Sequence, residues 1–179
     1  MNPGKTTSDH TNREPTNQDA LRFGRTPNSG GFRLEAVQFL PQSRDRLFEF
    51  FGDAFQLETI TPPWLHFTEL TPAPIQITAG SLIEYRLRLH GIPIRWRTRI
   101  SVWEPPLRFV DEQLHGPYRR WHHEHLFEET PSGTRARDIV HYSVPGGRLV
   151  NWLLIQPDLM KVFTYRTDKL RELFGALHK

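Results

Sequence analysis

One stretch decides the fold of this chain: residues 109–145, which read FVDEQLHGPYRRWHHEHLFEETPSGTRARDIVHYSVP. Two segments that contain Gly and Pro divide it into three runs in which polar and apolar residues alternate. This pattern predicts three antiparallel strands joined by tight turns. In the middle run, Trp121, His123, His125 and Phe127 are two residues apart, so they share one face of their strand. Because aromatic residues flank the two histidines, we interpret this face as the inward one.

Turn lengths determine which residues of these strands lie opposite one another. A three-residue turn at 116–118 would set Asp111 opposite His123, and the turn at 130–133 would set His125 opposite Asp138. Each inward histidine would then have an aspartate neighbour. We expect such pairs, because a buried imidazole or carboxylate is costly unless it has a partner. The interpretation depends on the register, since a slip of one residue would turn all of these side chains outward.

The clearest hairpin lies upstream, where LIEYRLRL at 82–89 and IRWRTRISVW at 94–103 flank a short turn. With Leu89 opposite Ile94, the alternation puts Val102 and the other apolar residues on one face and a row of arginines on the other: Arg86, Arg88, Arg95, Arg97 and Arg99. This division is typical of an antiparallel sheet that is covered on one side. We favour a solvated face for the arginines, with a protein partner or a phosphate as the alternatives. Because no aromatic residues are interleaved with these arginines, a nucleic-acid partner is not expected.

The N-terminal part of the chain divides into an arm and the start of a domain. Residues 1–30 are rich in Thr, Asn, Ser, Pro and Gly, so we expect a disordered polar arm, followed by a single domain over residues 31–179. FRLEAVQFL at 32–40 is typical of a first strand. Ser43 is a suitable N-cap for a short amphipathic helix, and Asp53 is suitable for a second one.

The C-terminal part predicts one long helix that ends at Gly175. Its apolar residues fall on one face, with Arg166 or Thr167 between them: Leu159, Phe163, Leu170 and Phe174. Pro157 should divide this helix into a front segment and a main one. The predicted fold class is therefore α+β, a helix-grip arrangement. In it, a strongly twisted antiparallel sheet wraps around a long C-terminal helix, and two short helices follow the first strand.

Composition excludes several classes of function. The chain of 179 residues has a net charge of +3, no cysteine, no apolar run long enough to span a membrane and no secretory signal, so we expect a cytoplasmic protein. Disulfides, thiolate nucleophiles and zinc–cysteine sites are ruled out. His123 and His125 offer two metal ligands, with Asp111 or Asp138 as a conceivable third, but the zinc-protease, nucleophile-elbow and phosphate-loop motifs are lacking. The sequence therefore predicts neither a metal nor a cofactor.

The order of these elements over residues 32–175 resembles the helix-grip fold of the START-like superfamily, also called SRPBCC or the polyketide cyclase and lipid-transport superfamily. Three stretches are similar to the ligand-binding SRPBCC proteins of bacteria: FVDEQLHGPYRRWHHEHLFEE, TRARDIVHYSVPGG and, in the last helix, FTYR. Some of those proteins are found beside or fused to epimerase-like proteins described as cell-division inhibitors. The resemblance implies a cavity for a hydrophobic ligand.

Three hypotheses for the inward polar layer follow. In the first, a cavity between the sheet and the long helix binds an apolar small molecule, such as a lipid, a quinone or a polyketide-like compound, whose polar group meets the histidines and aspartates. In the second, the protein is similar to the cyclases and dehydratases of the superfamily: His123 or His125 acts with Asp138 as a general base, and Tyr142 polarises a carbonyl. In the third, the polar layer is purely structural. The expected ligand-binding residues are Tyr85, Leu87, Trp96, Asp111, Gln113, Trp121, His123, His125, Phe127, Asp138, Tyr142, Leu159 and Phe163.

Overall fold

The computed structural model describes residues 19–26 and 30–175 of the chain. Its strands are β1 (Ala20–Arg25), β2 (Phe32–Leu40), β3 (Thr68–Glu69), β4 (Leu82–Leu89), β5 (Ile92–Glu104), β6 (Arg108–His115), β7 (Arg120–Thr130) and β8 (Gly133–Ser143). Its helices are α1 (Arg44–Phe51), α2 (Gln56–Thr59), the 3-10 turn η1 (Pro63–Leu65), α3 (Gly147–Val150), the π-helical segment η2 (Asn151–Ile155) and α4 (Gln156–Phe174). The fold is α+β, as predicted.

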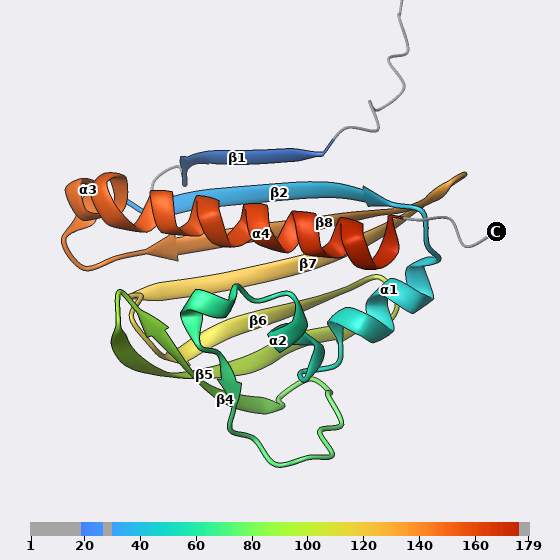
Figure 1. Ribbon diagram of the computed structural model, residues 1–179, viewed down its shortest axis with the longest axis horizontal. Helices are drawn as coiled ribbons and strands as arrows, with labels where there is room; N and C mark the ends of the chain where they lie inside the picture. Colours follow the sequence, from blue (N-terminus) through green and yellow to red (C-terminus); the bar gives the residue numbers. More distant parts are fainter. Residues whose placement is uncertain (1–18, 27–29, 176–179) are drawn as a thin grey trace, which may run out of the picture.

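All eight strands form one antiparallel sheet in the order β1-β2-β8-β7-β6-β5-β4-β3. The helices lie on one face of it, with α4 along β2 and β8, α1 near the C-terminal end of α4, and α2 over β6 (Figure 1). The predicted face of α4 is confirmed, because Leu159, Phe163, Leu170 and Phe174 are its buried residues. Pro157 stands in the first turn of α4, directly after η2; the chain stays helical from Gly147 to Phe174, and the expected kink or division takes the form of a change from π-helical to α-helical pairing just before the proline. None of the helices described here is long and apolar enough to cross a bilayer.

β1 was not predicted, because it lies within the segment assigned to the polar arm. The strand predicted to be the first, at 32–40, is β2. Residues 20–25 form β1, which pairs with β2 along its whole length. Leu21 and Phe23 pack against the buried cluster of β2, β8 and α4, and Asp19 accepts a hydrogen bond from Phe39 N and contacts Arg171. Two alternating apolar residues and one anchored carboxylate are thus enough to order this edge. The rest of the predicted arm, residues 1–18 and 27–29, lies outside the described residues.

The register of the β4–β5 hairpin differs from the predicted one by two residues. Leu89 pairs with Ile92 instead of Ile94, across a tight turn in which His90 and Gly91 both have positive φ. Two such residues suit the twist of a two-residue hairpin. Because the shift is an even number, the predicted inward residues of β4 still face the helices.

A bulge in the β5–β6 pairing makes a second prediction wrong, that Val102 faces the helices. The register shifts between Ile100 and Val102. Beyond the bulge it is Trp103, instead of the predicted Val102, that packs against Phe48 of α1, with ring centroids 4.9 Å apart. An extra residue in one strand exchanges the two faces of that strand, and the alternation of the sequence alone does not reveal it.

The arginine row lies on the outer face of the sheet, and carboxylates on the same face neutralise part of it. Glu84 contacts both Arg95 and Arg97, and Glu112 lies 2.8 Å from Arg99. Glu84 shares the outer face of β4 with Arg86 and Arg88. Its negative charge reduces the repulsion between arginines on neighbouring strands, so the row can face solvent without a partner.

Candidate functional site

A cavity of about 210 Å³ lies between the inward face of β4 to β7 and the helices. Phe50 and Phe51 of α1 and several residues of the connection to β3, among them Ile60 and Phe67, also line it. Most of the residues expected to bind a ligand line this cavity: Tyr85, Leu87, Trp96, Asp111, Trp121, His123, His125, Leu159 and Phe163.

Four of the expected residues are placed elsewhere. The Gln113 amide donates to Tyr118 O at 2.7 Å and accepts from Tyr118 N, so it holds the β6–β7 turn. Phe127 is buried in the core under α1, because Phe51 packs on it. Tyr142 packs in an aromatic cluster with neighbours that include Tyr118, and burial raises its pKa to about 12. Asp138 lies behind the histidines, against a much smaller hollow.

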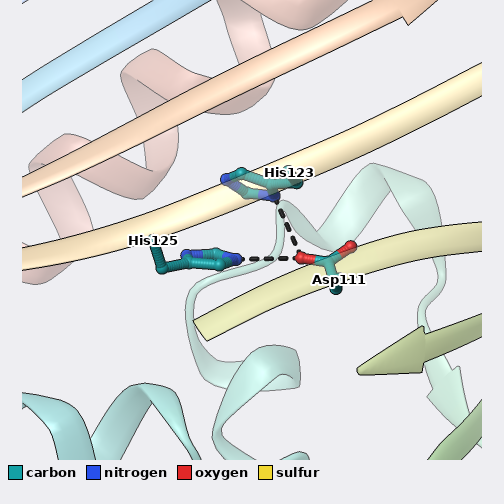
Figure 2. Close-up of side chains that lie close together, drawn as sticks. All are labelled: Asp111, His123 and His125. Atoms are coloured by element: carbon teal, nitrogen blue, oxygen red, sulfur yellow. Dashed lines mark hydrogen bonds and ion pairs between the residues drawn. The ribbon is translucent and has the colours of Figure 1, made fainter. Parts of the chain in front are cut away.

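The polar edge of the cavity is a cluster of two histidines and two aspartates. The cross-strand neighbours are those predicted, Asp111 with His123 and His125 with Asp138. Figure 2 shows both imidazoles directed at the same carboxylate: Asp111 Oδ2 lies 2.9 Å from His125 Nε2 and 3.3 Å from His123 Nδ1. On the other side, His123 Nε2 is 3.0 Å from Asp138 Oδ1. Each aspartate therefore lies between two imidazoles.

The hydrogen bonds connect diagonal neighbours instead of the directly opposite ones. Asp111 bonds His125 and Asp138 bonds His123, while His125 Nδ1 lies 2.7 Å from Asp138 Oδ1 without hydrogen-bond geometry. Phe109 accounts for part of this arrangement. It is opposite His125 and stacks on that ring with centroids 4.1 Å apart, so the imidazole reaches along β6 to Asp111.

A fifth charged group, Arg166 of α4, completes the cluster. Its guanidinium lies 3.8 Å from Asp138 Oδ1 and over the ring of Phe51. Burial alone would raise the pKa of Asp138, but the positive charges of Arg166 and His125 outweigh it and hold that pKa well below its usual range. Burial would raise the pKa of Asp111 too, yet the two histidines lower it.

The cluster shifts the pKa values of the two histidines in opposite directions. Burial would lower the pKa of His125, but Asp138 and Asp111 raise it above its ordinary value. The pKa of His123 is lowered by burial and then by the charge of His125. Beside the two carboxylates and Arg166, the cluster thus favours the protonated form of His125 and disfavours the protonated form of His123, relative to a free histidine. Such pairing is what makes buried charges tolerable.

His123 and Asp111 both line the cavity, so they can exchange hydrogen bonds with a polar group of a ligand. A further donor points to the same use. Trp96 is buried and lines the cavity, and its Nε1–H has no acceptor among the residues that the structure describes. Buried indole N–H groups usually have a partner.

The polar edge of the cavity also offers ligand atoms for a divalent cation. The donor atoms of Asp111, His123 and His125 lie within 4.8 Å of one another, and imidazole nitrogen with carboxylate oxygen is a common ligand set for zinc. A cation here would compete with protons for the imidazole nitrogens and would meet the positive charge of Arg166. Its binding would therefore release a proton and weaken as the pH falls.

Sequence reasoning noted Arg166 on the inward face of the last helix but did not assign it to the site. An arginine between Phe163 and Leu170 on an apolar helix face was the available signal, because such a charge needs a partner inside. The connection from Asp53 to Ile77 gave no such signal. It has no regular periodicity, yet it supplies much of the cavity wall.

No family model and no curated protein sequence matches the chain. Solved structures share its antiparallel-sheet fold. Protein Ms6760 from Mycobacterium smegmatis is similar with a TM-score of 0.62 and 14% identity, over 86% of this chain and 97% of that one. Protein CV1439 from Chromobacterium violaceum gives a TM-score of 0.65 and 12% identity, over 81% and 99% of the two chains. CalU16 from Micromonospora echinospora gives 0.52 and 12%, over 86% and 84%. At these identities the likeness concerns the fold alone.

Proposed function

We propose that this protein belongs to the SRPBCC superfamily and binds a small apolar molecule with a polar group in the cavity beneath α4. The shared fold and the three family-like stretches support the superfamily. The lining supports the ligand class, because aromatic and aliphatic side chains surround one polar edge.

The volume narrows the size of that molecule. A cavity of about 150 Å³ in another protein accommodates benzene, whereas typical pockets for drug-sized ligands begin at about 300 Å³. At about 210 Å³, this cavity suits one or two rings or a short chain. A quinone-like or phenolic ring thus fits the proposal better than a long-chain lipid.

The observation that carries the proposal is the indole N–H of Trp96, a buried donor without an acceptor at the wall of an apolar cavity. An unsatisfied buried donor costs about 1–3 kcal/mol. A ligand oxygen that accepted this hydrogen bond would remove that cost, while the cavity would shield the rest of the ligand from water.

The indole N–H signals offer a direct test, because the chain has five tryptophans. Naphthol and naphthalene serve as matched probes with and without an oxygen. In nitrogen–proton correlation spectra, naphthol should move the Trp96 indole signal downfield, and naphthalene should move it much less. Trp96→Phe identifies the signal and should weaken naphthol binding, whereas Trp152→Phe, on the surface, should leave it unchanged. Absence of any response at Trp96 and Trp121 would contradict the proposal.

A second candidate function rests on His123. Burial lowers its pKa, it lines the cavity, and Asp138 holds it at 3.0 Å, which is the arrangement of a general base with an orienting carboxylate. Tyr142 does not line the cavity, so the polarising donor in such an enzyme would be the indole N–H of Trp96. The test is deuterium exchange at the carbon next to the carbonyl of tetralone. Exchange above the buffer rate that His123→Gln abolishes would favour the enzyme, and exchange at the buffer rate would contradict it.

A further inference from the structure

The front part of the C-terminal helix has its polarity reversed. Leu149, Trp152, Leu153 and Leu154 are 63%, 67%, 53% and 51% exposed, while Asn151, the polar residue among them, is 4% exposed. A helix on the surface of a globular protein normally buries its apolar residues and exposes its polar ones. Scattered exposed leucines are ordinary, but a contiguous apolar surface of this kind marks an interaction site.

This apolar turn projects from the domain. Successive residues of a helix point in different directions, so the three neighbours Trp152, Leu153 and Leu154 of η2 do not share one face. All three are more than half exposed. A projecting apolar turn suits insertion into the soft apolar layer at the boundary of headgroups and acyl chains.

Three other segments meet the helix at the same end of the molecule (Figure 1). His90 of the β4–β5 turn contacts Asp158 of α4 at 2.6 Å. Arg119 of the β6–β7 turn donates its backbone N–H to Ser143 at the end of β8, and Tyr118 and Ile155 pack against one buried cluster. The apolar turn is therefore the tip of a continuous end surface.

The charges around this tip are basic and unpaired. Arg119, Arg120 and Arg148 are exposed, and none of them is within ion-pair distance of a carboxylate among the described residues. The carboxylate of Asp158 nearby is engaged by His90. We call this end the docking surface: Leu149, Trp152, Leu153 and Leu154, with Arg119 and Arg148.

We propose that the docking surface binds the protein to the face of an anionic lipid bilayer. Trp and Leu on a helix flanked by arginines are the composition of interfacial helices, which bury their apolar residues at the boundary of headgroups and acyl chains. The free guanidinium groups attract anionic headgroups over a Debye length. Acidic lipid matches both features at once, the apolar tip and the uncompensated positive charge.

The cavity lies close to the docking surface, so binding to a bilayer would bring the cavity near the lipid. Leu89 and Leu159 line the cavity, and each is the direct sequence neighbour of a residue in the His90–Asp158 contact. One end of the cavity therefore lies beside the docking surface. Bilayer binding does not depend on the ligand proposal, because none of the residues of the docking surface lines the cavity.

Vesicle co-sedimentation tests the proposal. The full chain should pellet with vesicles of phosphatidylcholine and phosphatidylglycerol in equal parts, and much less with phosphatidylcholine alone. The double variant Trp152→Ser/Leu153→Ser should lower the partition coefficient by roughly tenfold or more, given the apolar area removed from water. Leu107→Ser is the matched control, because Leu107 is 50% exposed in the β5–β6 turn at the other end of the sheet.

The arginines are tested separately. Arg119→Gln/Arg148→Gln should weaken binding to the anionic vesicles and reduce its sensitivity to salt, whereas Arg22→Gln, on exposed β1, should change neither. Thermal unfolding checks that each variant is folded. Wild-type protein that stays in the supernatant, or a Trp152→Ser/Leu153→Ser variant that pellets like wild type, would overturn the proposal. A wild-type dimer in light scattering that the same double variant disperses would also overturn it, because the surface would then join two copies.

Discussion

The two faces of strand β6 carry the same chemistry in different surroundings. Asp111 faces the cavity and lies 2.9 Å from His125. Its neighbour Glu112 faces outward, where it lies 2.8 Å from Arg99 and 3.1 Å from His122. The distances are nearly equal, but the inner histidine side chains are 6% exposed and the outer Arg99 is 48% exposed. Burial, and not geometry, should therefore decide what each pair is worth.

The two faces should differ widely in the stability that is lost when one partner of an ion pair is removed. Removal of one partner of a buried pair leaves an uncompensated charge in the interior and costs about 3–5 kcal/mol. An exposed pair contributes about 0.2–1 kcal/mol, because water solvates each charge when its partner is removed.

Asp138→Asn should have the largest effect, a loss of about 3–5 kcal/mol in the free energy of unfolding. The substitution removes one of the two carboxylates beside His125 and the one carboxylate within ion-pair distance of Arg166 among the described residues. It should also move the titration of His125 to lower pH, because the negative partner that raises its pKa is gone. Urea unfolding and NMR titration measure the two effects. A loss below about 1 kcal/mol, or an unchanged His125 curve, would show that the inner pairs behave like surface pairs.

Phe163→Ala should cost less than Phe127→Ala, although both side chains are 3% exposed. Phe163 borders the cavity, whereas Phe127 is packed against α1. A fully packed phenylalanine is worth about 3–5 kcal/mol, and we expect about 2–3 kcal/mol at Phe163 because fewer contacts are lost there. Equal losses in urea unfolding would mean that the cavity is filled by protein in solution.

The two histidines should give opposite pH dependences. The pKa of His125 is raised in the folded state, so its contribution is fully present below the usual histidine pKa and is lost as the pH rises through the folded value. The cost of His125→Gln should therefore shrink toward alkaline pH. The pKa of His123 is lowered, so the folded state resists its protonation and the cost of His123→Gln should shrink toward acidic pH. Slopes of the same sign in unfolding curves across pH would reject the charge assignment within the cluster.

Much of this inner face could be predicted from the sequence, because two rules act together there. The period of two in a strand places His123 and His125 on one face, and two short turns fix Asp111 and Asp138 as their neighbours. The structure confirms these neighbours. The same rules say nothing of how an imidazole leans within its layer, so the diagonal hydrogen bonds were not foreseen.

The remaining features depend on tertiary packing. Arg166 reaches Asp138 from a helix far along the chain, and only the folded structure brings the two together. The bulge after Ile100 and the two-residue turn at His90 change register locally, which alternation does not record. β1 lies in a polar segment, and its Leu21 and Phe23 become partly buried only when the strand pairs with β2.

Glu112→Gln should have the smallest effect, a loss of about 0.2–1 kcal/mol. Hydrogen bonds from Arg99 and then from His122 lower the pKa of Glu112, so its contribution is present above the usual glutamate pKa and is lost as the pH falls through the lowered value. Salt should reduce the effect further, because the pair is open to solvent. Urea unfolding at low and high salt, with Asp138→Asn measured alongside, tests the comparison between the faces. A loss as large as that of Asp138→Asn would mean that the outer face is covered in solution, and the arginine row would then be a contact with a partner instead of a solvated surface.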